Sequence, residues 1–138
     1  RALGEELEGS EEDQVRKAQH ILWEGWDISQ GKALGSILGR FNDPFPVFKR
    51  IVALANRYMY TLPPWERTDV AVEGGIGFDF TACPCYDLCV KEGVPELTKA
   101  FCDMDWQLAE YFPPQIEFKR EQTLGDGADH CDFRYYRR

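Results

Sequence analysis

The sequence predicts an α+β domain in which N-terminal helices are followed by an antiparallel sheet, and a two-helix excursion interrupts that sheet. Two observations carry this prediction. Apolar residues recur at helical spacing in the first half of the chain, whereas apolar and polar residues alternate over much of the second half. The length of 138 residues is typical of one domain. We therefore expect a single domain over residues 1–138, with a helical part at 1–62 and a sheet-and-helix part at 63–138.

The first half of the chain is expected to form three helices. The first begins near Ser10, because Ser10 and Asp13 have the spacing of a capping box. Glycines recur after residue 24, and they predict a break at residues 30–32 before a second helical segment at 33–40. A third helix is expected at 46–61, and two prolines end it. Its predicted apolar face consists of Val47, Ile51, Leu54 and Tyr58.

The second half changes from helical periodicity to alternation. The alternating residues at 76–82 predict a strand. An earlier strand at 69–73 competes with a turn, because Gly74 and Gly75 follow it. The remaining expected elements are helices at 86–92 and 95–111 and strands at 116–124 and 128–136, the last two paired across a turn.

Charge and hydropathy restrict the partners. The formal net charge is −8, which argues against nucleic acid because phosphate binding needs a basic face. No apolar run approaches the ~18–20 residues that a membrane-spanning helix needs. We expect a small-molecule substrate as the partner, with neither nucleic acid nor a membrane, and a homo-oligomer is compatible with the sequence. The chain begins with Arg1 and shows no signal-peptide pattern, so we expect a truncated N-terminus and a cytoplasmic location.

The five cysteines are an odd number and are too sparse for a disulfide scaffold, which predicts mostly reduced thiols. The gaps between Cys83, Cys85 and Cys89 differ from the CxxC spacing of structural zinc sites. Metal binding is the alternative to free, buried thiols, and we expect neither a metal nor a cofactor. Cys83 precedes a proline where a strand ends and a helix begins. The helix dipole there lowers the pKa of a thiol, so Cys83 is a candidate nucleophile.

Asp105 is the second candidate. On a helical wheel it lies at the edge of the apolar stripe, whereas Asp103 lies on a solvated side. A carboxylate at a core boundary needs a partner, which is either a backbone turn or a ligand. Cys102 lies three residues before Asp105, on the flanking side of the same helix. Arg120 shares the face of its strand with apolar residues, which is unusual for a plain core face.

The final strand presents two different faces. Cys131, Phe133 and Tyr135 point to a predicted core, and His130, Asp132, Arg134 and Tyr136 point the other way. Asp132 and Arg134 can pair with each other at the surface, where such a pair contributes little to stability. If this face lines a pocket instead, Arg134 is a fork for a substrate carboxylate. His130 is either a surface histidine or a ligand contact.

Five elements of the second half follow one another in a recognisable order. They are Phe80-Thr81-Ala82-Cys83-Pro84, Gly93-Val94-Pro95-Glu96-Leu97, Phe101-Cys102-Asp103-Met104-Asp105, Arg120-Glu121-Gln122-Thr123-Leu124 and Gly127-Ala128-Asp129-His130-Cys131-Asp132-Phe133-Arg134. This series resembles the L-2-amino-thiazoline-4-carboxylic acid hydrolase family over about residues 76–136. The last element is the most specific, and residues 1–60 carry no motif of this pattern.

The resemblance implies a hydrolase that opens a cyclic isothiourea, cleaving a carbon–nitrogen or carbon–sulfur bond of the ring, to give N-carbamoyl-L-cysteine. The candidate catalytic residues are Cys83, Asp105 and Asp132, and the candidate substrate-binding residues are Arg134, Arg120, Cys102 and His130. Two mechanisms stay open. The Cys83 thiolate attacks the ring carbon directly, or Asp105 or Asp132 acts as general base for an attacking water.

A binding or sensor module is the alternative function. The order of elements and the Cys-Pro position are also similar to the 4-vinyl reductase domain family, whose members bind small apolar molecules. A third alternative is a subunit that needs further chain or a partner to complete its site. A largely apolar, enclosed pocket would favour binding, whereas a pocket in which Asp, Arg and Cys converge would favour the enzyme.

Overall fold

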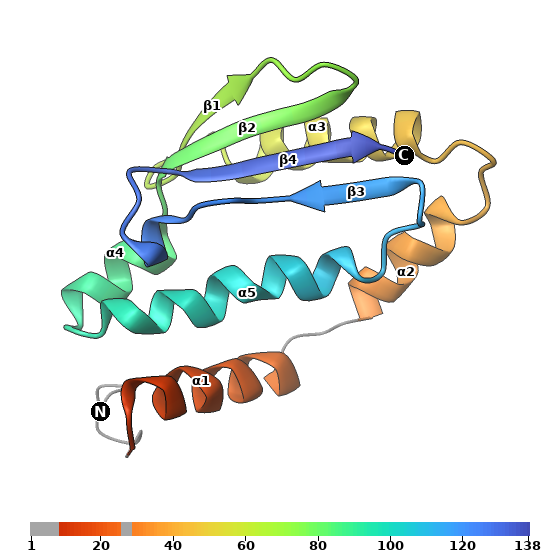
Figure 1. The fold of residues 1–138 in the computed structure, drawn as a ribbon. Coiled ribbons are helices and arrows are strands. Elements are labelled where there is room, and N and C mark those ends of the chain that lie inside the picture. Colours follow the sequence, from red (N-terminus) through yellow and green to blue (C-terminus); the bar gives the residue numbers. More distant parts are fainter. Residues whose placement is uncertain (1–8, 26–28) are drawn as a thin grey trace.

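The computed structural model describes residues 9–25 and 29–138 and confirms the predicted α+β class (Figure 1). The helices come first, the sheet is antiparallel, and two helices are inserted between its strands. The elements are α1 (Glu11–Gly25), α2 (Ser29–Leu38), α3 (Phe45–Met59), β1 (Glu66–Val70), β2 (Gly75–Ala82), α4 (Pro84–Lys91), the 3-10 turn η2 (Pro95–Leu97), α5 (Thr98–Ala109), β3 (Ile116–Lys119), the 3-10 turn η3 (Leu124–Asp126) and β4 (Cys131–Arg137). None of the helices in this part of the chain has the length and apolar content to cross a membrane.

The four strands lie in the order β1-β2-β4-β3, so β4 is an inner strand with a neighbour on each side. Phe133 of β4 stands opposite Phe78 of β2, and Tyr135 stands opposite Phe118 of β3. These four aromatic side chains share one face of the sheet, where their rings stack or meet edge to face. The alternation of β4 thus places its apolar residues on the inner face, as predicted.

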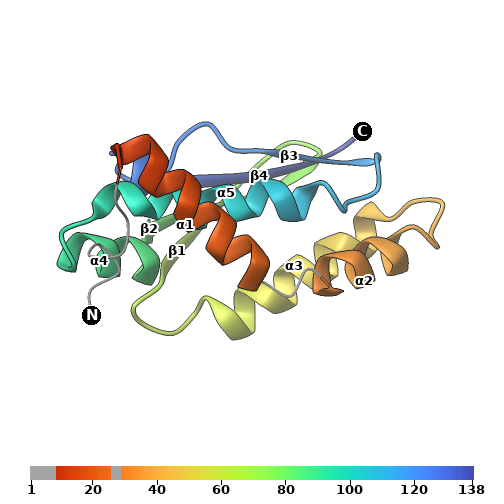
Figure 2. The ribbon, with the colours of Figure 1, turned by 90° about the horizontal axis from the view of Figure 1, so that it is seen from below.

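The helices cover this inner face in two layers. Figure 1 shows α1 below α5, and Figure 2, seen from below, shows α1 crossing in front of α5 with α3 to one side. Helix α1 packs on α5 through a core cluster that contains Ala18, Cys89, Leu97 and Ala100. The amide of Gln19 donates to Asp103 Oδ2 at 2.6 Å, so the expectation that Asp103 is solvated is wrong. Its carboxylate anchors the outer helix.

The start of α1 matches the predicted capping pattern. The Ser10 hydroxyl accepts the backbone N–H of Asp13 at 3.3 Å and donates to the Asp13 carboxylate at 2.8 Å. The predicted break at residues 30–32 is wrong, because these residues belong to α2. The junction of α1 and α2 falls at 26–28, outside the described residues.

The glycines of α2 serve close packing rather than a helix break. A Cβ at position 35 would lie 2.3 Å from the backbone oxygen of Tyr111, and one at position 31 would lie 3.0 Å from the Tyr111 ring. Two glycines four residues apart therefore let α2 approach the segment that follows α5. Sequence patterning alone does not separate this use of glycine from helix termination.

The predicted apolar face of α3 is wrong in half of its members. Leu54 and Tyr58 are exposed, at 54% and 69%. Phe48 and Asn56 are buried instead, at 2% and 6% exposure. Together with Val52 they form an i, i+4, i+8 row that faces the sheet. The buried face of α3 is therefore rotated about the helix axis relative to the predicted apolar face.

The strand expected at 116–124 is shorter than its alternation suggested. It ends at Lys119, because the backbone N–H groups of Glu121 and Gln122 donate to the Asp132 carboxylate instead of to a neighbouring strand. Leu124 then opens the turn η3, where the Thr123 hydroxyl accepts the backbone N–H of Asp126 at 3.1 Å. The antiparallel pairing of β3 with β4 is confirmed.

Candidate functional site

A cavity of about 380 Å³ lies between α3, α5 and the inner face of the sheet. Most of its wall is apolar, and Phe48 and Val52 of α3, Phe101, Met104 and Leu108 of α5, and Phe78, Phe80, Phe133 and Tyr135 of the sheet contribute to it. This volume is near the lower end of the range for small-molecule sites. The helix stripe predicted for α5 therefore forms a cavity wall as well as core.

Four of the five cysteines line this cavity. Cys83 and Cys85 come from the start of α4, Cys102 comes from α5, and Cys131 comes from β4. Cys89 lies apart from them, in the core beneath α1. All five are free thiols, as predicted. In the described residues no group of three or more His, Cys, Asp or Glu side chains is arranged to hold a metal ion.

Cys83 occupies the N-cap position of α4, with extended backbone angles and Pro84 as the first helical residue. A hydrogen bond from the Cys85 thiol, together with the backbone N–H groups of Tyr86 and Cys85, lowers the pKa of Cys83 to about 7. The same contact and burial raise the pKa of Cys85. Of the two neighbouring thiols, Cys83 is therefore the one that carries the thiolate near neutral pH.

Cys102 and Cys131 form a second thiol contact on another part of the wall. Their mutual hydrogen bond and burial raise the pKa of Cys102. The same bond lowers the pKa of Cys131, whose sulfur also accepts the backbone N–H of Leu124 at 3.2 Å. Cys102, predicted as a substrate contact, thus reaches the cavity with a neutral thiol.

Asp105 and Arg120 meet at the cavity wall. Arg120 Nη1 donates to Asp105 Oδ2 at 2.6 Å, and Arg120 Nη2 donates to the backbone oxygen of Cys102 at 2.8 Å. Burial raises the pKa of Asp105 to about 6, although the charge of Arg120 acts in the opposite direction. The partner that Asp105 needs is a charged side chain, and the carboxylate borders the cavity as well.

The guanidinium of Arg120 is enclosed by aromatic rings. It lies 5.5 Å from the ring centre of Phe133 and 5.9 Å from those of Trp106 and Phe118. Its side chain is 4% exposed, compared with 39% for Asp105. The aromatic rings and the Asp105 carboxylate together replace water around the cation. This explains how a charged residue, Arg120, can be buried directly after β3.

Asp132 lies on the opposite face of β4 from the cavity thiol Cys131. Its Oδ1 accepts the backbone N–H groups of Glu121 at 3.0 Å and Gln122 at 2.8 Å. The residue is 9% exposed, and it does not line the cavity. Asp132 therefore holds the segment that directly follows Arg120.

Arg134 and His130 also lie on that outer face of the sheet. Arg134 forms an ion pair with Asp79 at 2.8 Å and donates to the backbone oxygens of Phe78 and Phe133. His130 Nε2 lies 3.7 Å from Asp79. The pKa of His130 is raised, first by its hydrogen bond to Asp129 and also by Asp79. The structure thus brings Cys83, Cys102, Asp105 and Arg120 together at the cavity and places Asp132, Arg134 and His130 elsewhere.

Sequence reasoning missed two kinds of polar group at the cavity. Asn56 of α3 lines it, is 6% exposed and has no hydrogen-bond partner among the described residues. Its spacing of eight residues from Phe48 was the available signal. Tyr60 and Tyr135 also line the cavity, and burial raises the pKa of both phenols.

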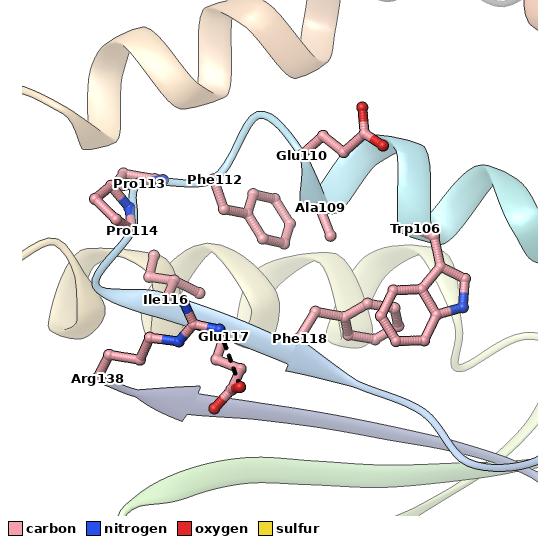
Figure 3. Close-up of a pocket in the computed structure, with 10 residues that line it drawn as sticks. All are labelled: Trp106, Ala109, Glu110, Phe112, Pro113, Pro114, Ile116, Glu117, Phe118 and Arg138. Carbon is pink, nitrogen blue, oxygen red and sulfur yellow. Dashed lines mark hydrogen bonds and ion pairs between the residues drawn. The ribbon is translucent and has the colours of Figure 1, made fainter.

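A second, shallower hollow of about 280 Å³ lies between the end of α5 and β3 (Figure 3). Trp106 and Phe118 lie against each other on its floor, with ring centres 4.7 Å apart. Glu117 accepts a hydrogen bond from Arg138 at 3.0 Å at its rim. Its lining holds no thiol, and its ion pair of Glu117 and Arg138 involves an exposed arginine, so the larger cavity is the candidate site.

Comparison with known proteins supports the family indicated by the sequence. The family model described as L-2-amino-thiazoline-4-carboxylic acid hydrolase matches residues 3–135. Among solved structures, the chain is similar to an H-NOX protein from S. oneidensis in the Fe(II)NO ligation state, with 15% identity, coverage of 95% of this chain and 77% of that chain, and a TM-score of 0.36. The H-NOX domain from Shewanella oneidensis in the Fe(II)CO ligation state gives 15% identity, coverage of 94% and 76%, and a TM-score of 0.34. No curated protein matches the chain.

The family match extends well beyond the region that the sequence motifs covered. The motifs begin near residue 76, whereas the match includes all three N-terminal helices. Helix α3, which forms one wall of the cavity, is therefore part of the family's own fold rather than an addition to it. The chain belongs to the L-2-amino-thiazoline-4-carboxylic acid hydrolase family.

Proposed function

We propose that this protein is a hydrolase that opens the ring of a 2-amino-thiazoline carboxylate to give an N-carbamoyl amino acid. One observation carries the proposal: a thiol with a pKa of about 7 and a carboxylate with a pKa of about 6 border the same cavity. Perturbed pKa values of this kind are concentrated at functional sites. Family membership supports the substrate class.

The proposed first step is attack by Cys83. Its thiolate adds to the ring carbon that bears the amino group, and the bond between this carbon and the ring sulfur then breaks. The released sulfur takes up a proton and becomes the thiol of the product. The two carbon–nitrogen bonds stay intact, and the substrate is linked to Cys83 as an isothiourea. A thiolate is the suitable nucleophile because it is formed near neutral pH at this N-cap position.

The proposed second step uses one water molecule. Asp105 accepts a proton from the water as it adds to the same carbon, and the carbon–sulfur bond to Cys83 breaks. The carbon becomes the carbonyl of a ureido group, and the Cys83 thiolate is regenerated. The sum is one substrate and one water giving one N-carbamoyl product. Direct attack by water, with Asp105 as base and no link to Cys83, is the alternative route within the same function.

Asp105 also provides the charge that an amidinium needs. Arg120 holds one of its oxygens, and in this proposal the other oxygen accepts a hydrogen bond from the amino group of the substrate. Arg120 is a positioning residue in this proposal. We assign Asp132, Arg134 and His130 to support of the sheet and of the segment after Arg120, because none of them lines the cavity.

The test is turnover of 2-amino-thiazoline-4-carboxylate by the purified chain, with the N-carbamoyl product measured by chromatography. We expect turnover in the wild-type protein and its loss in Cys83→Ser, whereas Cys89→Ala, which changes a thiol outside the cavity, retains activity. Rapid quenching and mass spectrometry should show a substrate adduct on the peptide that contains Cys83. Turnover by Cys83→Ser would support the water route, and no turnover by the wild-type protein would contradict the hydrolase.

The apolar wall favours a second candidate, a module that binds a small apolar molecule without transforming it. Phenylalanine side chains from α3, α5 and the sheet dominate the lining. This function predicts tight binding of uncharged aromatic or aliphatic compounds, undiminished in Asp105→Asn. The hydrolase predicts that the same substitution abolishes turnover, so one variant separates the two functions.

A further inference from the structure

Asn56 is an anomaly in the core of the protein. It lies inside α3, where asparagine is a weak helix former. Its side chain is 6% exposed and lines the cavity, and no hydrogen bond joins it to another described residue. Its amide is not among the fully buried side-chain atoms that lack a partner, so it reaches the open space of the cavity. Burial of an amide without a partner destabilises a fold, and a leucine of similar size would fit the apolar row formed with Phe48 and Val52. The position therefore carries a cost that the fold itself does not require.

The charges at the cavity show what the amide is needed for. Among the described lining residues, Asp105 and Arg120 are the only fully charged pair, and they neutralise each other. Arg120 is 4% exposed and already donates to Asp105 and to the backbone oxygen of Cys102. A ligand with an amidinium at one end satisfies Asp105. A carboxylate at the other end of the ligand cannot easily reach the Arg120 guanidinium, which is buried and already bonded. It therefore needs a hydrogen-bond donor from another part of the cavity wall.

The Asn56 side chain supplies such a donor. Its amide has two N–H groups, both without partners in the described residues, and it projects from α3 whereas Asp105 projects from α5. The thiols that share the lining are weak donors, and Tyr60, Tyr135 and Trp65 offer one O–H or N–H each, whereas the Asn56 amide offers two N–H groups. A neutral donor also suits the site electrically, because a ligand that carries both charges adds no net charge beside the Asp105–Arg120 pair, which is neutral overall.

We propose that Asn56 is the specificity-determining residue of the site and that its amide donates to the carboxylate of a small zwitterionic ring compound whose amidinium faces Asp105. This inference rests on the proposed function for the ligand class. It adds the discrimination between ring compounds with and without a carboxylate, which family membership does not assign to any residue.

The test measures binding by calorimetry in a Cys83→Ala background, which prevents the proposed covalent step. The two ligands are 2-amino-thiazoline-4-carboxylate and 2-amino-2-thiazoline, the same ring without the carboxylate. We expect the parent protein to bind the carboxylated ring at least ten-fold more tightly, and Asn56→Asp, which replaces the donor by an anion of the same shape, to abolish this preference. Asn42→Asp makes the same change at the only other asparagine of the chain, which is exposed, and should retain the preference.

A second variant separates a binding role from a structural one. Asn56→Leu should keep or raise the melting temperature, because it removes an unpartnered buried amide, and it should lose the preference for the carboxylated ring. A lower melting temperature together with an unchanged preference would overturn the inference, because Asn56 would then stabilise α3 rather than bind the ligand.

The failure of this inference and that of the proposed function give different results. If wild-type protein turns over the carboxylated ring and Asn56→Asp retains the preference, the hydrolase stands and the role of Asn56 is overturned. If Asn56→Asp loses the preference but wild-type protein shows no turnover, the role of Asn56 stands and hydrolysis is overturned. If the parent protein binds neither ring compound, both proposals are overturned.

Discussion

The Arg120 guanidinium and the Asp105 carboxylate meet at 2.6 Å on the cavity wall, and only the carboxylate side chain is exposed to a substantial degree. Arg120 is 4% exposed and Asp105 is 39% exposed. The pair therefore presents an oriented anion to a ligand while its cation stays behind aromatic rings. An anion held in this way is already oriented when a cation or a proton donor reaches it.

The first prediction concerns the pH dependence of turnover. The charge of Arg120 lowers the pKa of Asp105, so Arg120→Met should raise that pKa above its present value of about 6. Because the proposed mechanism uses the ionised carboxylate, the acid limb of the kcat/KM profile should shift to higher pH, and the maximum should fall. Lys119→Met, an exposed neighbour, is the control and should leave the profile in place. An unshifted acid limb in a folded Arg120→Met protein would show that Asp105 is not the titrating group.

The second prediction concerns the reactivity of the cavity thiols. The Cys83 pKa is about 7, whereas burial and thiol contacts raise the pKa values of Cys85 and Cys102. The pKa of Cys131 is also lowered, but this residue is only 6% exposed, so iodoacetamide should modify Cys83 first at neutral pH. The rate of this fast phase should rise with pH through a midpoint near 7. Peptide mass spectrometry identifies the site. Cys83→Ala should remove the fast phase and Cys102→Ala should retain it, and a fast phase that persists in Cys83→Ala would refute the assignment.

The third prediction concerns the close contact between α2 and the segment after α5. Gly35→Ala should destabilise the fold by about 1–3 kcal/mol, because the new methyl group would lie 2.3 Å from the Tyr111 backbone oxygen and the helix must move. Ser36→Ala, the adjacent exposed position of the same helix, should change stability by less than about 0.5 kcal/mol. Urea denaturation measures both. Equal stabilities for the two variants would mean that α2 does not make this approach in solution.

The fourth prediction concerns His130. Its pKa is raised in the folded protein, first by Asp129, so its protonation stabilises the fold below the ordinary histidine pKa of 6.5. That contribution is lost as the pH rises through the higher folded pKa. His130→Gln should therefore reduce the urea midpoint at pH about 5.5 and leave it nearly unchanged at pH about 9. Asp129→Asn should show a smaller effect of the same sign, and a deficit in His130→Gln that grows with pH would contradict the prediction.

The positions of two polar cavity residues, Asp105 and Arg120, could be predicted from helical spacing and strand alternation in the sequence. The wheel position of Asp105 and the strand parity of Arg120 each indicated a polar residue against a core, and the structure brings them together. The face assignment in β4 was equally accessible, because alternation is a local property. What alternation does not reveal is which partner a polar residue meets. The possible pair of Asp132 with Arg134 does not form, because Arg134 pairs with Asp79 and Asp132 accepts two backbone N–H groups.

The missing parts depend on contacts between distant segments. Asn56 lies in a helix whose exposed side is also apolar, so periodicity favoured the wrong stripe. Gly35 belongs to a helix, although isolated glycines also end helices, and only the position of Tyr111 distinguishes the two uses. A cavity is an absence of side chains between elements, and no local pattern records it. These features therefore required the tertiary structure.

The seven residues of β4, an inner strand, contribute side chains both to the cavity on one face of the sheet and to the ion pairs on the other face. A shift of this strand by one residue would exchange its faces, placing Asp132 and Arg134 toward the cavity and turning Cys131 and Phe133 to solvent. An insertion or deletion within β4 would therefore disrupt both faces of the sheet, and we do not expect the cavity to evolve in that way. New specificities in such a fold would arise instead by point substitution along the cavity side of α3, where no strand neighbour depends on the register.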